Sequence, residues 1–126
     1  MAKAEAPAKP ILRDQQRALH AYGAVSRVQK AQQKDYQIAV NDLGANILRS
    51  GLCAALASVQ RLGNRGDILL GHLANAGVPG LDDATASDLA QRVRELSADS
   101  YMIATRELLS VTTWLKRAVQ ATFEEA

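Results

Sequence analysis

The chain has 126 residues, enough for one domain that closes a single core without disulfides or a structural metal. Good helix formers such as Ala, Leu, Gln and Arg are abundant, whereas only 4% of residues are aromatic, so the composition favours helices over strands. The net charge of +2 does not by itself indicate a polyanionic partner, and the lone cysteine, Cys53, excludes an intramolecular disulfide.

The charge is unevenly distributed along the chain. Residues 1–65 carry ten Lys or Arg against four Asp or Glu, a net charge of +6. Residues 66–126 carry five against nine, a net charge of −4, and the two halves sum to +2. This distribution is typical of a chain with a basic surface for nucleic acid and an acidic surface elsewhere, and also of charges scattered over a helical protein.

Residues 1–10 lack the apolar stretch of a signal peptide, and we expect them to form a disordered N-terminal arm. A proline-free segment follows, and its apolar residues recur at helical spacing, which predicts a helix over residues 11–33. Its narrow apolar stripe consists of Ala18, Leu19, Tyr22 and Val25. Basic residues gather on another arc of the same predicted helix, at about 100° per residue. They are Arg13, Arg17, His20, Arg27 and Lys34, with Lys30 at the margin.

A second helical region is expected from about Tyr36 to Arg61, with a bend or break near Gly44. Its middle, residues 45–59, is apolar almost all round and contains small residues, which is typical of a helix in the centre of a bundle. Arg49 is the one charge in that stretch. Either its stem lies along apolar surface with its head in water, or it contacts a phosphate or a carboxylate.

Three further helices complete the predicted architecture. Gly66-Asp67 is expected to cap a helix from Ile68 to Ala76, and Asp82-Asp83 a helix that ends near Leu96. The last helix begins at Ser97, Asp99 or Ser100 and ends near Phe123. Its expected core stripe is Tyr101, Ala104, Leu108, Val111, Leu115 and Ala118, and its opposite stripe is Arg106, Ser110, Thr113 and Arg117. The sequence therefore predicts an all-α fold, a compact bundle of about five helices, in a single domain over residues 11–126.

The sequence contains no recognisable catalytic or metal-binding constellation. His20 and His72 lie on different predicted helices, and with Cys53 they do not make the three or four ligands that a metal site needs. No glycine lies in a strand-to-helix phosphate loop, and Asp82 and Asp83 are interpreted as helix caps. We expect no enzyme activity, no cofactor and no small-molecule substrate. The longest charge-poor stretch is too polar to span a bilayer, so we expect no membrane partner and a cytoplasmic location.

A helix-turn-helix is the one DNA-binding alternative that the sequence offers. Residues 58–73 have its outline, but the helix that would read bases contains no Lys or Arg. A DNA-binding regulator is therefore disfavoured.

Three segments carry a family resemblance. Tyr101–Leu109 and Trp114–Arg117 combine a tyrosine, a Thr-Arg-Glu run and a Trp-Leu-Lys-Arg step, and Asn46–Ala57 is an apolar segment around a Gly-Leu pair, preceded by Tyr36. In this order they resemble the small subunits of type III-B CRISPR (Cmr-type) effector complexes. The likeness covers most of residues 11–123.

The resemblance implies a non-catalytic subunit of an RNA-guided ribonucleoprotein that acts in antiviral defence. Small subunits of this family are helical bundles that stack in several copies as an inner filament, and their basic faces line the channel that holds the guide–target duplex. The implied partners are the other subunits of the effector complex, further copies of the chain, the guide RNA and the target RNA.

Basic side chains that neutralise phosphates without reading bases suit a duplex whose sequence is set by the guide. We therefore predict RNA contacts from a set of eight residues: Arg13, Arg17, Arg27, Lys30, Lys34, Arg49, Arg106 and Arg117. Two alternatives remain open from the sequence alone. One is a helical protein-interaction adaptor that does not bind nucleic acid, and the other is the equivalent small subunit of type III-A complexes.

Overall fold

The computed structural model describes residues 12–123, and within that range the chain is helical and without strands. The helices are α1 Arg13–Ser26, α2 Lys30–Ser50, α3 Leu52–Gln60, α4 Asn64–Ala74, α5 Leu89–Arg94 and α6 Ala98–Thr122. The predicted all-α bundle is confirmed. None of these helices combines the length and the apolar character needed to span a bilayer. The arm predicted over residues 1–10 lies outside the described range.

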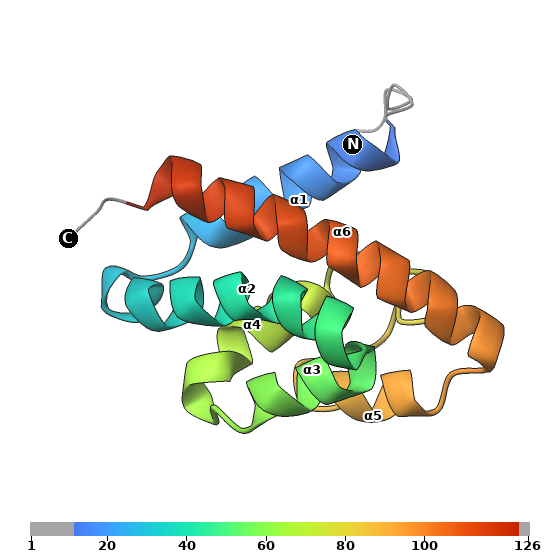
Figure 1. The fold of residues 1–126 in the computed structure, drawn as a ribbon. Helices are drawn as coiled ribbons and strands as arrows, with labels where there is room; N and C mark the ends of the chain where they lie inside the picture. Colours follow the sequence, from blue (N-terminus) through green and yellow to red (C-terminus); the bar gives the residue numbers. More distant parts are fainter. Residues whose placement is uncertain (1–11, 124–126) are drawn as a thin grey trace.

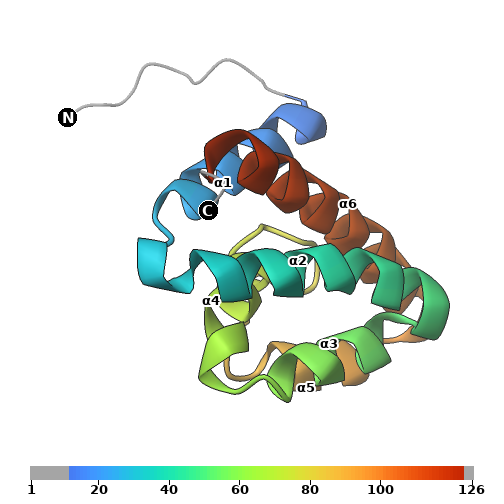
Figure 2. The same cartoon turned by 60° about the vertical axis from the view of Figure 1, so that its left-hand side comes forward.

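The helices are arranged around α2, which lies in the middle of the bundle (Figures 1 and 2). The long helix α6 crosses the whole molecule on one side of α2, with α1 packed along it. Helices α3, α4 and α5 lie on the other side, and α2 contacts both α3 and α4. Because α2 separates the two groups, its Tyr36, Val40, Leu43 and Ile47 are all buried.

The last helix follows its prediction closely. Ser97 is the N-cap residue of α6, and its hydroxyl accepts the Ser100 N–H at 3.2 Å. The predicted core stripe is buried from Ala104 to Ala118, and Tyr101 is half-buried. The Tyr101 hydroxyl accepts the backbone N–H of Cys53 at 3.0 Å, so α6 also satisfies a free donor at the start of α3.

The helix predicted over residues 11–33 is wrong at its C-terminal end. Helix α1 stops at Ser26, and α2 begins four residues later at Lys30. The chain reverses through Arg27, Val28 and Gln29, where the Val28 side chain is buried and Gln29 has an extended backbone. Lys30 and Lys34 therefore belong to α2, and the predicted basic arc does not lie on a single helix.

The expected helix from Tyr36 to Arg61 is interrupted at Gly51, and Gly44 lies inside α2 without a break. Gly51 has a φ of 93°, a conformation that residues with a Cβ rarely adopt. The break changes the direction of the chain, so the prediction of a helix buried all round over residues 45–59 is also wrong. Leu48 is 75% exposed, whereas Leu52 and Leu56 beyond the break are fully buried.

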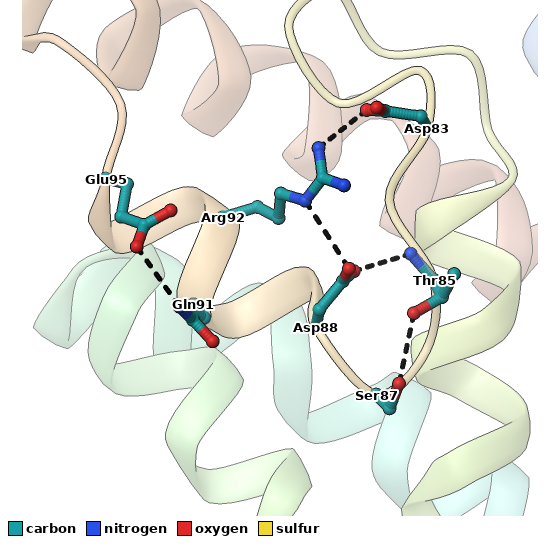
Figure 3. Close-up of polar contacts among 7 residues, drawn as sticks. All are labelled: Asp83, Thr85, Ser87, Asp88, Gln91, Arg92 and Glu95. Atoms are coloured by element: carbon teal, nitrogen blue, oxygen red, sulfur yellow. Dashed lines mark hydrogen bonds and ion pairs between the residues drawn. The ribbon is translucent and has the colours of Figure 1, made fainter.

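The helix predicted after Asp82-Asp83 is reduced to the six residues of α5, preceded by turns. Asp83 does not cap a helix; its carboxylate accepts from the Arg92 guanidinium at 2.6 Å (Figure 3). Asp88 accepts the Thr85 N–H at 2.7 Å and lies 3.4 Å from the same guanidinium. The Thr85 hydrogen bond holds the pKa of Asp88 below its ordinary value. These contacts stabilise a turn where the sequence suggested helix. The preceding helix, α4, begins at Asn64, four residues before its predicted start at Ile68.

Candidate nucleic-acid interface

The predicted RNA-binding residues occupy three regions of the surface. Arg13 lies at the start of α1, and Arg106 and Arg117 lie on the exposed stripe predicted for α6. Arg27, Lys30 and Lys34 lie at the connection between α1 and α2, and Arg49 lies in the last turn of α2. These seven side chains are exposed, whereas Arg17 is only 4% exposed.

Arg17 is therefore not on the solvated arc where the sequence placed it. Its Nη2 donates to Glu107 Oε1 of α6 at 2.6 Å, and its Nη1 donates to the Ala76 carbonyl at 2.8 Å. The buried face of α1 is formed by Arg17, Ala21, Ala24 and Val25, and α1 packs on α6 through it. Arg17 thus connects three parts of the fold and is not available to a phosphate.

Glu107 is the important residue that the sequence analysis did not single out. Its Oε2 accepts from Arg13 Nη1 at 2.8 Å, so one carboxylate binds two guanidinium groups from α1. Burial by itself raises the pKa of Glu107, but the hydrogen bonds from Arg17 and Arg13 outweigh burial and lower the pKa. The sequence does contain a sign that Glu107 is buried. Glu107 lies within the apolar stripe of α6, three residues after Ala104 and four before Val111.

A second polar contact joins α1 to α6 near Arg13. The Trp114 Nε1–H donates to Asp14 Oδ1 at 3.2 Å. The guanidinium carbon of Arg117 lies 5.1 Å from the centroid of the Trp114 ring, within the range of a cation–π interaction. The exposed cation of Arg117 is therefore in contact with an indole that is itself bound to the other helix.

The second basic region surrounds the connection between α1 and α2. A Cβ built on Gly23 would lie 3.7 Å from Arg27 Nη1, so the Arg27 side chain runs back along α1. Lys30 and Lys34 are exposed in the first two turns of α2. Tyr36, two residues after Lys34, has its ring centroid 6.2 Å from that of Phe123, just past the end of α6. This region therefore lies beside the C-terminal end of α6, as Figure 1 shows.

The two histidines take part in a structural network. Tyr36 Oη and His72 Nδ1 are 2.7 Å apart, and His20 Nε2 donates to the His72 carbonyl at 2.8 Å. Burial lowers the pKa of His72 to about 4, helped by His20 and Arg27, and burial raises the pKa of Tyr36. Within residues 12–123, no three His, Cys, Asp or Glu side chains gather as a metal site would require. This network joins α1, α2 and α4.

Comparison with known proteins finds a matching family model and similar solved structures. The family model described as CRISPR-associated protein (Cas_Cmr5) matches residues 13–122. The crystal structure of a CRISPR-associated Cmr5 family protein from Thermus thermophilus is similar, with a TM-score of 0.80 and 29% sequence identity. The similarity covers 90% of this chain and 100% of the Thermus chain. No protein with curated annotation matches the sequence.

The fold and these matches define a small helical subunit of a CRISPR RNA-targeting complex. The chain belongs to the Cmr5 family, the small subunits of the type III-B effector complex. The resemblance found in α6 and the central segment is thereby confirmed, and the family is the type III-B family and not its type III-A counterpart.

Glu107→Gln should lower the free energy of unfolding by about 3–5 kcal/mol, because it leaves the buried Arg17 guanidinium without a counter-charge. The measurement is urea denaturation at pH 7. Asp83→Asn is the matched control, since it breaks a contact of the same 2.6 Å length at a side chain that is 79% exposed. The control should cause little change, and equal losses in the two variants would show that burial does not decide the effect.

Stability should fall as the pH is lowered from about 6.5 to about 4, the His72 pKa values of the unfolded and folded chain. In that window the unfolded state binds a proton that the folded state excludes, since His72 is packed beside Tyr36, His20 and Arg27. Urea denaturation of wild type and His72→Gln between pH 7 and pH 5 measures this loss above the range where carboxylates titrate. The two proteins should differ in slope, and parallel curves would contradict the assignment.

Proposed function

We propose that this chain is a non-catalytic subunit that stabilises the guide RNA–target RNA duplex through contacts to phosphates. The observation that carries the proposal is the set of exposed cations on α1, α2 and α6, described above. Arg13 is held at the surface by Glu107 and Arg117 by Trp114, so two of these cations have defined positions. Lys and Arg that contact phosphates bind a duplex whatever its sequence, as a guided complex requires.

The other polar clusters join segments of the fold to one another. This structural use of their charged groups supports a role in binding and not in catalysis. Glu107 pairs with arginines of α1, His72 contacts Tyr36, and Arg92 pairs with Asp83 and Asp88. Each of these groups has its partner within the fold. RNA cleavage in the complex is assigned by this proposal to other subunits.

The proposal includes stacking of several copies into a filament, with the outer face of α1 against the next copy. This face carries Leu12, Gln15, Leu19 and Tyr22, with Leu12 71% and Leu19 67% exposed. A shallow groove of about 340 Å³ lies along Gln15, Ala18, Leu19 and Tyr22, all of them uncharged. Depletion of charge around apolar and aromatic residues is typical of the centre of a protein interface.

A second copy of the chain is the proposed occupant because two separate regions of the surface carry complementary charges. Residues 82–95 carry four carboxylates against two arginines, whereas the α1–α2 connection carries Arg27, Lys30 and Lys34. These two regions lie on different parts of the bundle, since the α1–α2 connection is at the left of Figure 1 and α5 lies along the lower side beside α3. A contact between unlike surfaces is heterologous, and it generates a filament when it repeats from copy to copy without closing.

One alternative, a protein-interaction adaptor without RNA binding, is favoured by the uncharged face of α1. On that alternative the basic residues of α1, α2 and α6 are only a solvated surface. The two functions differ in how the assembled complex responds to loss of these charges.

Lys30→Ala together with Lys34→Ala should weaken retention of target RNA by the assembled effector complex. Each lost phosphate contact should reduce the slope of log affinity against log salt by roughly 0.7–0.9 per copy. The measurement is target-RNA affinity across a salt series, with the copies in each complex counted by native mass spectrometry, because Lys30 and Lys34 also lie in the region proposed to meet the next copy. Arg61→Ala with Arg94→Ala removes the same charge from exposed positions on the α3–α5 side and should leave the slope unchanged. Equal behaviour of the two double variants would favour the adaptor function.

Leu19→Glu should reduce the number of copies in the complex, because it places a charge at the centre of the apolar face of α1. Native mass spectrometry of the complex counts the copies. Ala57→Glu, at an exposed position of α3, is the control that adds the same charge elsewhere. A wild-type copy number in Leu19→Glu would contradict the proposed contact.

A further inference from the structure

We infer that Asp14 and Trp114 are positioning residues that orient Arg117 for an RNA phosphate. This inference rests on the proposed function and goes beyond it, because neither Asp14 nor Trp114 was predicted to take part in RNA binding. The structural basis is a continuous series of contacts from α1 to the exposed guanidinium. Asp14 binds the indole N–H of Trp114 at 3.2 Å, and the indole ring lies 5.1 Å from the guanidinium carbon of Arg117.

The spacing on α6 explains why Trp114 and Arg117 meet. Residues three apart on a helix are neighbours on its surface, so the Arg117 side chain lies across the indole face. A free arginine side chain populates many rotamers, and part of this conformational freedom is lost when the side chain binds a phosphate. Contact with the ring restricts the side chain before binding, and the planar guanidinium keeps its N–H groups for a phosphate.

The orientation of the indole depends on the packing of α1 against α6. Trp114 is half-buried, and its only ring donor is used by Asp14, which lies 100 residues earlier in the chain. Without that acceptor the indole loses the contact that fixes its plane relative to α1. Arg13, next to Asp14 in the chain, is held in the same way by Glu107 of α6. Cations from both helices are thus oriented by contacts across one helix–helix junction.

The negative charge of Asp14 and its proposed positioning role have opposite effects on RNA binding, so an experiment can distinguish them. A carboxylate close to a phosphate-binding arginine repels the RNA, so its removal should strengthen binding if Asp14 had no other role. On the positioning role, a variant that loses both the charge and the oxygen acceptor binds RNA more weakly than a variant that loses only the charge. Two substitutions separate these effects, because Asn retains the side-chain oxygen and Ala does not.

The experiment compares Asp14→Asn with Asp14→Ala in the reconstituted effector complex, with target-RNA affinity as the readout. Both variants remove one negative charge, but only Asn can accept the indole N–H. We expect Asp14→Ala to bind target RNA about two- to fivefold more weakly than Asp14→Asn, as the loss of an exposed cation–π contact implies. Reduced helix stability would not explain this order, because Ala favours helix α1 more than Asn does. Equal affinities of the two variants would overturn the inference.

Arg117→Gln supplies the control that separates this inference from the proposed function. In the Arg117→Gln background, the two Asp14 variants should bind RNA equally, because the residue that they position is gone. If Arg117→Gln weakens binding but Asp14→Ala and Asp14→Asn bind alike, the positioning role is wrong and the phosphate contact stands. If Arg117→Gln leaves both the affinity and the salt slope unchanged, Arg117 has no RNA contact and both proposals fail at this residue.

Fluorescence gives an independent readout, since Trp114 is the only tryptophan in the chain. In the isolated protein, Asp14→Ala should shift the emission of Trp114 and raise its quenching by acrylamide, whereas Asp14→Asn should remain close to wild type. Identical emission and quenching in the three proteins would show that Asp14 does not hold the indole, and would overturn the inference.

Discussion

The buried ion pair between Arg17 and Glu107 is the interaction on which the arrangement of the basic surface depends. A guanidinium and a carboxylate that are both removed from water are stable only when they meet each other in good geometry. Here they meet at 2.6 Å, and Arg17 also binds the Ala76 carbonyl. The pair therefore restricts how α1 can rotate or slide on α6. That restriction places Arg13 and Asp14 beside Glu107 and Trp114.

The three sides of α1 differ in the residues that they carry. The buried face, with Arg17 and three small or β-branched apolar residues, anchors α1 to α6. The outward face is apolar and uncharged, as protein interfaces are at their centres. The edge beside α6 carries Arg13 and is continuous with the cation–π pair of Trp114 and Arg117. On the proposed function, this helix of 14 residues separates a surface that anchors the fold, a surface for a second copy and a surface for RNA.

Much of the fold could be predicted from the sequence, but the pairing of its charges could not. Helix α6 has one apolar period over its length, so most of its core stripe was predicted correctly, and its N-cap residue, Ser97, was one of the three candidates for its start. The reversal at Arg27–Gln29 contains no Gly or Pro and was missed, and Gly51 breaks the chain through a positive φ that periodicity does not reveal. Arg17 was misplaced because its partner lies 90 residues away, and helical spacing shows which residues share a side but not which side is buried.

The most direct test of this account is to map where RNA touches the chain in the assembled complex. Guide or target RNA containing 4-thiouridine would be photo-cross-linked, and the cross-linked peptides identified by mass spectrometry. The account predicts cross-links in the segments around residues 13–17, 27–34 and 106–117, which include the exposed cations of α1, α2 and α6. Cross-links confined to α3, α4 and α5, with none in these segments, would contradict it.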